Sequence, residues 1–193
     1  ATLRHHVATF GGEIVRITPR LAFEAPGGDA ELTGVYFADA GQYIENRLLV
    51  DHAVPNCRSN VLYKGALQGD KASKLPEART CWVGDVLIRA DAKGTDTYET
   101  NRNLVLTDGA RADAIPNLEI ETGEIAGAGH AATVGRFDDD QLFYLRSRGI
   151  REEDATRLII RGFFNEVLNQ IPVESIREEL IARVAGELER NEN

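Results

Sequence analysis

The sequence predicts a mainly β fold followed by a small helical region. Short segments alternate apolar and polar residues through the first two thirds of the chain, a period that indicates strands. Composition then changes near residue 138, because 15 of the 18 glycines and five of the six prolines lie before it. After that point apolar residues recur at helical spacing. We therefore expect a β core over residues 1–137 and a helical C-terminal domain over residues 138–193.

Six segments carry the strand signal, with Gly, Asp, Asn and Pro between them as turn formers. They are Glu13–Thr18, Glu31–Phe37, Asn60–Tyr63, Cys81–Arg89, Arg102–Thr107 and Asn117–Glu121. No helical pattern separates them, which excludes a doubly wound α/β fold and leaves a sandwich, a barrel or a β-helix. Alternation followed by a Gly/Asp turn recurs loosely over residues 81–134, which favours a β-helix, although no strict period is visible.

Three helices are expected after the β region. Asp138–Ser147 opens with three acids, which favour a helix N-terminus, and ends near Gly149. A second helix begins at about Glu152 and ends before Pro172, and Val173–Leu188 forms a third with one apolar stripe. The apolar positions of the second helix are Ala155, Leu158, Ile159, Phe163, Val167 and Ile171.

Charge and composition narrow the class of protein. Lys and Arg number 22 against 31 Asp and Glu, and the net charge of −9 opposes binding to nucleic acid or to an anionic membrane. Two cysteines suit a reducing compartment, and no long apolar run or signal peptide is visible, so we expect a cytoplasmic protein. The chain begins at Ala1 and contains no Met, so we expect it to be an internal or C-terminal piece of a longer protein.

The sequence carries no familiar catalytic motif. G-x-S-x-G, the P-loop, H-E-x-x-H and C-x-x-C are all absent, and no glycine-rich stretch matches a dinucleotide-binding fingerprint. We therefore expect no enzyme of these classes.

Most histidines and cysteines are interpreted as structural. His5 and His6 are adjacent and point to opposite faces of a strand, so they cannot easily share a metal. His52 and Cys57 lie five residues apart and could form a pair of metal ligands, but zinc needs three or four ligands and no others lie nearby in the sequence. We therefore favour a polar turn histidine and a buried cysteine. Cys81 is interpreted as a packed strand residue.

His130 differs because its neighbours are small. It lies in the segment GEIAGAGHAATVGRF, residues 123–137, whose glycines and alanines leave the ring uncovered. Either another chain packs against it, or it reaches into a cavity, or it is a structural histidine bonded to a strand carbonyl. Imidazole is the commonest protein metal ligand, but one histidine does not make a site.

Several segments, taken in order, resemble the SufB/SufD family, the scaffold subunits of the SUF iron–sulfur cluster assembly machinery. The TLRHH opening and the SNVLYKG segment fit the family as well. The remaining matching segments are Thr95–Asn103 (TDTYETNRN), Leu104–Asp108 (LVLTD), Pro116–Ile120 (PNLEI), Gly129–Gly135 (GHAATVG) and Gln141–Ile150 (QLFYLRSRGI).

Within that family the chain resembles SufD-like more than SufB-like sequences. Its FYLRSRGI motif is typical of SufD-like sequences, and from His130 it reads H-A-A-T where SufB-like sequences read H-E-A-T. The cysteine that SufB-like sequences carry at about Asn101 is also absent. A SufB-like scaffold that holds the cluster itself remains an alternative, as does a β-helix enzyme acting on polysaccharide.

The resemblance implies a right-handed parallel β-helix followed by helices. It also implies pairing with a SufB-like subunit through the β-helix, docking of a SufC-like ATPase on the helices, and a role for His130 in holding iron at the SufB-like interface. No cofactor is expected on this chain alone, only transient iron or an iron–sulfur cluster in the complex. Many SufD-like sequences carry a cysteine shortly before this histidine, whereas this chain reads AGAG over residues 126–129, so further ligands would come from the partner.

Two partner questions stay open at this stage. Whether the chain also forms a homodimer is not indicated by the sequence. Three short helices cannot bury all their apolar area, and Ile160, Phe163, Phe164 and Leu168 extend the apolar surface of the second helix beyond one stripe. We expect some of this surface to pack on the β-helix and the remainder to dock the ATPase; the alternative is that all of it is internal core.

Overall fold

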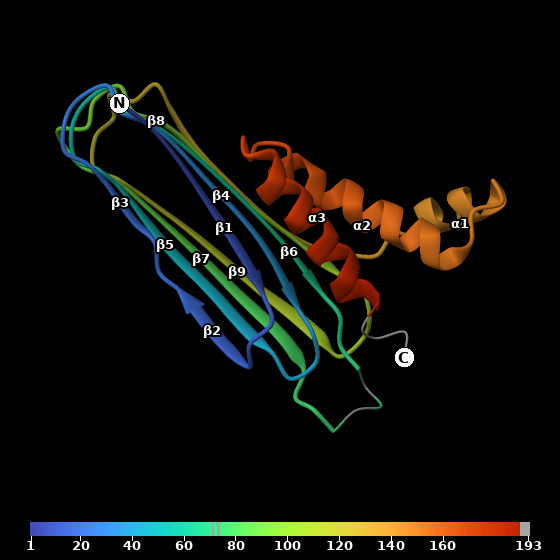
Figure 1. Cartoon of the computed structure of the whole chain (residues 1–193). Coiled ribbons are helices and arrows are strands. Elements are labelled where there is room, and N and C mark those ends of the chain that lie inside the picture. Colours follow the sequence, from blue (N-terminus) through green and yellow to red (C-terminus); the bar gives the residue numbers. More distant parts are fainter. Residues whose placement is uncertain (71, 73, 190–193) are drawn as a thin grey trace.

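The protein is a parallel β-helix of about four turns with three helices packed on one of its faces (Figure 1). The computed structural model describes residues 1–70, 72 and 74–189. Two parallel sheets lie face to face, and the chain passes from one to the other in each turn. The mainly β fold with C-terminal helices, and the β-helix favoured by the sequence, are confirmed.

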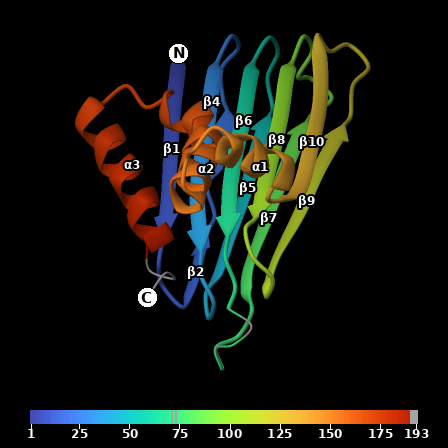
Figure 2. The ribbon, with the colours of Figure 1, turned by 90° about the vertical axis from the view of Figure 1, so that its right-hand side faces the viewer.

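Sheet A is the face that carries the helices (Figure 2). Its strands run in the order β1 (Thr2–Phe10), β4 (Asp29–Ala38), β6 (Arg58–Leu67), β8 (Asp96–Val105) and β10 (Gly127–Arg136).

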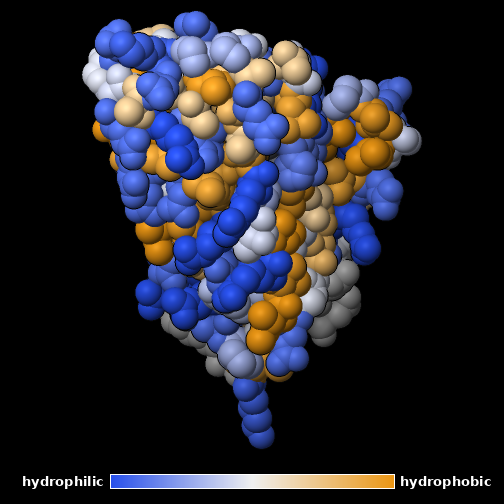
Figure 3. All heavy atoms as spheres, turned by 90° about the vertical axis from the view of Figure 1, so that its left-hand side faces the viewer, coloured by the Kyte–Doolittle hydropathy of each residue, from blue (hydrophilic) through white to orange (hydrophobic). Residues whose placement is uncertain are grey.

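Sheet B forms the opposite face, where hydrophilic side chains, blue in Figure 3, cover much of the surface. Its strands are β2 (Ile14–Ile17), β5 (Tyr43–His52), β7 (Ala78–Ile88) and β9 (Ala110–Ile120), with β3 (Arg20–Phe23) also paired to β5.

Successive turns differ in length, which explains why no strict repeat is visible in the sequence. Along sheet A the register joins Thr2 to Asp29, Asp29 to Arg58, Arg58 to Asp96 and Asp96 to Gly127. The turns therefore advance by 27, 29, 38 and 31 residues. The longest includes the connection between β6 and β7.

Glycines let large rings fill the space between the sheets. A Cβ on Gly65 would collide with the ring of Tyr36, and one on Gly34 would collide with the ring of Tyr63. Both tyrosines are almost fully buried, together with Trp82. Because adjacent turns stack in register, a missing side chain on one strand makes room for a ring on the next.

Two of the three helices share a second core with the outer side of sheet A. The helices are α1 (Asp139–Ser147), α2 (Glu152–Leu168) and α3 (Glu174–Glu189), close to the predicted ranges. Asp138 caps α1 by accepting hydrogen bonds from the backbone of Asp140 and Gln141, as its three acids predict. The shared core contains Val35, Phe37, Leu62 and Ala66 of sheet A with Ile160, Phe164, Val167 and Leu168 of α2 and Val184 and Leu188 of α3. No described helix is long and apolar enough to cross a membrane.

The buried side of α2 matches the apolar positions expected from the sequence only in part. Ala155, Val167 and Ile171 are buried as expected. Ile160, Phe164 and Leu168 lie buried against sheet A, whereas Leu158 is 50% exposed. Of the four residues expected to divide between the β-helix and the ATPase, these three therefore pack on the β-helix. The sequence has apolar residues on nearly every side of α2, and contact with sheet A selects the side that is buried.

The boundary between strands and helices falls between Arg136, the last residue of β10, and Asp139, the first of α1. The core shared by the helices and sheet A joins the two parts. That residues 1–137 and 138–193 are separate domains stays a prediction.

Candidate functional site

The candidate site lies at the end of the β-helix where the chain leaves β10. Strands β9 and β10 each pair with only one neighbour, so this end of the solenoid is open on the described chain. Figure 2 shows both strands at the same edge, beside β7 and β8. The next turn of a longer solenoid, or another molecule, could stack on this end.

His130 projects from β10 at this open end. Its strand runs parallel to β8, and His130 pairs in register with Glu99. Glu99 is 1% exposed, and Ala128, two residues before His130, packs against the interior core. His130 therefore lies on the interior side of β10, and its side chain stays 44% exposed because no further turn covers it.

The small residues around His130 have two different physical causes. Ala128 and Ala132 lie on the same face of β10 as His130, and their small side chains project little from the open end. Gly129 faces the other side, where a Cβ would lie only 2.8 Å from the ring of Tyr98. The glycine just before the histidine is therefore explained by an internal ring contact as well as by clearance for another molecule.

Glu99 is the residue that sequence reasoning missed. Neither of its carboxylate oxygens has a hydrogen-bond partner among the described residues. Its Oε1 lies 3.9 Å from Nδ1 of His130. Burial, with a smaller contribution from the charge of Asp85, raises the pKa of Glu99 to about 8. The sequence indicates Glu99 only through the alternation in TDTYETNRN, which places residue 99 on the same side of the strand as residues 97 and 101.

Two other inward polar residues of β8, Asn101 and Asn103, are hydrogen-bonded to each other and to buried tyrosines. Asn103 donates to Asn101 Oδ1 at 2.6 Å, and the Tyr36 hydroxyl donates to Asn103 Oδ1 at 2.7 Å. Asn101 also donates to the Tyr36 hydroxyl and to the carbonyl of Tyr63. This closed network separates Asn101 and Asn103 from Glu99, which has no such partners.

The N-terminal histidines do not approach the open end. His6 Nδ1 lies 2.6 Å from the Thr33 hydroxyl, and His5 pairs in register with Leu32. Both lie on β1, at the other edge of sheet A.

The His52 and Cys57 pair does not form a metal site. His52 Nε2 lies 2.9 Å from the Ser59 hydroxyl, which is 2.6 Å from the Thr97 hydroxyl. The Cys57 thiol lies 3.6 Å from backbone carbonyls. The expected buried cysteine is confirmed, whereas the expected turn position of His52 is wrong, because His52 is fully buried at the end of β5. Among residues 1–70, 72 and 74–189, no three His, Cys, Asp or Glu side chains gather as a metal site.

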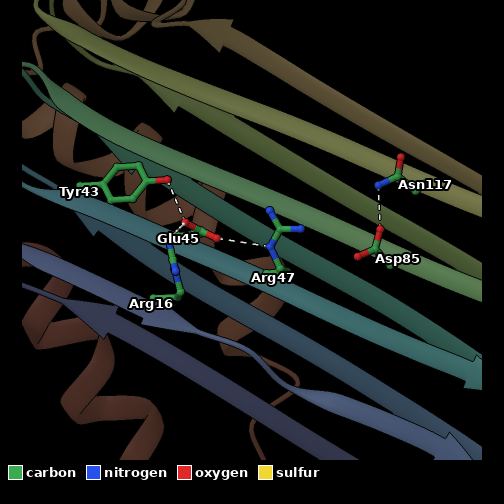
Figure 4. A network of polar contacts seen from close by, with 6 residues as sticks. All are labelled: Arg16, Tyr43, Glu45, Arg47, Asp85 and Asn117. Carbon is green, nitrogen blue, oxygen red and sulfur yellow. Dashed lines mark hydrogen bonds and ion pairs between the residues drawn. The ribbon is translucent and has the colours of Figure 1, made fainter.

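Cys81 lies half-buried on the outer side of sheet B, near a network of charged residues. Glu45 accepts hydrogen bonds from Tyr43, Arg16 and Arg47 there, as Figure 4 shows. Burial opposes ionisation of Glu45, but these hydrogen bonds outweigh it and hold its pKa below the usual range. The contact from Arg16 of β2 to Glu45 of β5 crosses between strands, and such pairs stabilise the face of sheet B.

A second candidate surface is an apolar groove between α2 and α3, about 360 Å³ in volume. Polar side chains at its edge are Asp154, Arg157 and Arg161. Its apolar lining is Leu158, Leu168, Ile181, Val184, Ala185 and Leu188. Among its apolar lining Leu158 is 50% exposed, and other exposed apolar side chains lie on α1, at Phe143 and Tyr144, and near the start of α3, at Val173 and Ile176.

Comparisons with known proteins agree with this architecture. Residues 1–163 match the family model described as the SufBD core domain of SUF system FeS cluster assembly. An iron-sulfur cluster assembly SufBD family protein of Mycobacterium tuberculosis is 66% identical over 193 residues, which are 100% of this chain and 49% of that protein. Iron-sulfur cluster assembly protein SufD of Escherichia coli is 30% identical over 188 residues, 97% of this chain and 43% of that protein.

A second SufBD family protein of Mycobacterium tuberculosis is 27% identical over 174 residues, 90% of this chain and 20% of that protein. The chain spans about half the length of the relatives that match it at 66% identity.

The fold defines a β-helix protein with an open end and a helical cover on one sheet. The chain belongs to the SufBD family of SUF-system iron–sulfur cluster assembly proteins. The resemblance found in its sequence motifs is confirmed, and the polysaccharide-active alternative has no support from these matches.

Proposed function

We propose that this chain is the SufD-like half of a scaffold pair that assembles iron–sulfur clusters. The observation that carries the proposal is the open end of the β-helix, where β9 and β10 each lack a second neighbour and His130 is exposed. Unpaired strand edges readily accept another strand. A SufB-like subunit stacked on this end would bring its own groups to His130.

A different family member suits the open end better than a second copy. Mycobacterium tuberculosis holds two SufBD family proteins, 66% and 27% identical to this chain, so a second family member is present there beside the relative of this chain. Pairing of two copies of this chain is the competing arrangement, and the experiment below separates the two.

Iron bound at the open end would need ligands from the partner. Cys57 is buried near β6, and Cys81 lies on the outer side of sheet B, so neither lies on the interior side of β10 with His130. Soft thiolate ligands suit iron–sulfur clusters, and in this arrangement they belong to the SufB-like subunit. His130 contributes one iron ligand, and iron is cargo of the complex.

The α2–α3 groove is the proposed docking surface for a SufC-like ATPase. Its apolar lining has charged residues of both signs at the edge, which suits a protein interface with an apolar centre and a polar rim. ATP hydrolysis then belongs to that ATPase, and this chain acts through contacts in the cytoplasm without turnover of its own.

Two substitutions test the two surfaces against each other. Val134→Arg places a charge on a half-exposed residue of β10 at the open end, and Leu158→Arg places one in the α2–α3 groove. In co-purification with SufB-like and SufC-like partners, Val134→Arg should lose the first and keep the second. Leu158→Arg should do the opposite.

Each variant is the matched control for the other. Loss of both partners from either variant, at unchanged melting temperature, contradicts the assignment of the two surfaces. If the wild-type protein forms only a dimer with itself, and Val134→Arg abolishes that dimer, the homodimer replaces the SufB-like pair. His130→Ala should lower the iron content of the reconstituted complex without dissociating it.

A further inference from the structure

Glu99 presents an unexplained feature of the open end. It is 1% exposed, and both carboxylate oxygens lack a hydrogen-bond partner among the described residues. Burying a carboxylate without partners is costly, and proteins rarely keep one without a functional reason. An apolar side chain would fill the same position more cheaply.

The neighbouring residues leave room for this carboxylate but do not satisfy it. A Cβ on Gly84 would collide with Glu99 Oε2 and with the ring of Trp82, so the glycine preserves the space that both side chains occupy. The indole nitrogen of Trp82 also has no partner among the described residues. The imidazole of His130, on the adjacent strand β10, lies within 4 Å of the carboxylate.

We propose that Glu99 and His130 together hold one divalent iron ion at the open end of the β-helix. Glu99 binds from the buried side and His130 from the exposed side. This inference rests on the proposed function, because it takes the iron cargo of the scaffold as the ion. Beyond the proposed function, it makes Glu99 a second iron ligand from this chain.

The distance between the two side chains fits a shared ion better than a direct bond. Nδ1 of His130 and Oε1 of Glu99 are 3.9 Å apart, beyond the range of about 2.7–3.2 Å for an N–H···O hydrogen bond. Imidazole and carboxylate ligands lie about 2.0–2.2 Å from an ion such as zinc, so two ligands of one ion are commonly 3–4 Å apart. Imidazole suits iron, and a carboxylate completes many iron(II) sites.

Two ligands do not fill the coordination sphere of iron. The remaining positions face the open end, where the partner subunit and water can reach them. An ion held in this way is fixed on one side and accessible on the other, which suits cargo that must be passed on.

The test measures binding of Fe²⁺ alone, without sulfide, to the complex of this protein with its SufB-like partner under anaerobic conditions. Four proteins are compared: wild type, His130→Ala, Glu99→Gln and Glu119→Gln. Glu119 lies exposed on β9, so its change to Gln is the same chemical change away from the site. We expect Fe²⁺ affinity to fall at least about tenfold in the first two variants and to stay unchanged in the third.

Each other result overturns part of the scheme. If His130→Ala weakens Fe²⁺ binding and Glu99→Gln does not, the further inference fails and the proposed iron ligand stands. If Glu99→Gln weakens it and His130→Ala does not, the shared site and the His130 ligand both fail. If neither does, or if wild type binds no Fe²⁺, both fail.

A second variant covers the case in which Glu99→Gln does not fold. Glu99→Asp keeps the carboxylate, but its side chain is one methylene shorter, so the oxygens lie farther from His130. This variant should bind Fe²⁺ more weakly while the complex still assembles. Wild-type affinity in Glu99→Asp, together with assembly, contradicts a direct ligand role for the carboxylate.

Discussion

His52 links the stability of the β-helix to pH through a single buried ring. It is fully buried at the end of β5, its ring centroid lies 4.7 Å from that of Phe23, and one of its nitrogens contacts Ser59. Burial lowers its pKa to about 4, against a small opposing effect of the Asp51 charge. The folded protein therefore resists protonation of this ring, whereas the unfolded chain protonates it near pH 6.5.

Stability should fall as pH is lowered from about 6.5 to about 4. The pKa of His52 is lower in the folded protein than in the unfolded chain, so the unfolded chain binds more protons in this pH range. Lowering the pH therefore stabilises the unfolded state relative to the folded state. The effect amounts to at most about 3 kcal/mol between pH 7 and pH 4. In urea unfolding at several pH values, the free energy of unfolding of His52→Gln should fall less steeply between about pH 6.5 and about pH 4 than that of the wild type.

Ser59→Ala is the control for this prediction. It removes the hydroxyl beside His52 but keeps the titrating ring, so it should lower stability and retain the acid dependence. If His52→Gln unfolds with the same pH dependence as wild type, other groups are responsible.

Gly65 gives a second prediction at the level of one residue. A methyl group there would collide with the buried ring of Tyr36, which is held by hydrogen bonds to Asn101 and Asn103 and cannot easily move. Overpacking of this kind costs about 1–3 kcal/mol. Gly65→Ala should lower the free energy of unfolding by that amount in urea.

Gly162 is the matched control, because nothing lies within 4 Å of a Cβ placed there. It lies inside α2, where Ala is a better helix former than Gly by about 1 kcal/mol. Gly162→Ala should therefore stabilise the protein. Equal effects of the two substitutions would show that the Tyr36 contact does not decide the cost.

At the level of elements, local pattern predicts strands and helices but not their partners. All six predicted segments overlap strands, because their apolar alternation is strong, and four of them extend one or two residues beyond a strand end. β5 (Tyr43–His52) was not predicted, since its ENR stretch looks polar although Asn46 points inward and is buried. β10 was not predicted either, because its Gly and Ala residues give no apolar signal.

The site shows the same limit of sequence reasoning. His130 could be singled out from its residue type and small neighbours. Glu99 could not, because the register between β8 and β10 that places residue 99 beside residue 130 depends on a turn of 31 residues. Only the fold determines that length.

Lys64 ties α2 to sheet A and gives a prediction at this scale. Its ammonium is nearly buried, donates to the Phe163 carbonyl at 2.8 Å and pairs with Glu166. It also lies 4.7 Å from the centre of the Phe163 ring. Lys64→Met keeps the apolar stem but leaves the carbonyl and Glu166 without this partner.

We expect Lys64→Met to lower the free energy of unfolding by about 1–3 kcal/mol in urea. Arg102→Met is the control, since Arg102 contacts the same carboxylate at 3.5 Å from a half-exposed position. Exposed pairs contribute at most about 1 kcal/mol, so its effect should be smaller. A larger loss in Arg102→Met than in Lys64→Met would contradict this account of how α2 is held.

At the level of the whole molecule, the two faces of the β-helix are stabilised differently. Charged pairs cross the strands of sheet B, such as Arg79 with Asp113 and Arg89 with Asp51. Sheet A instead presents Val35, Phe37 and Leu62 to the helices. One face can therefore meet water directly, while the other depends on its helical cover.

Ending the protein after residue 137 should consequently destabilise the β-helix. The truncation uncovers the apolar residues of sheet A that now contact Ile160, Phe164 and Val167. Exposed apolar patches of this kind promote association, so we expect a lower melting temperature and aggregation in size-exclusion chromatography. Supplying residues 138–193 as a separate peptide should restore part of the solubility, because it covers the same patch. A monomeric truncated protein with an unchanged melting temperature would instead show that residues 1–137 form an independent domain, and that the helices serve only their partner.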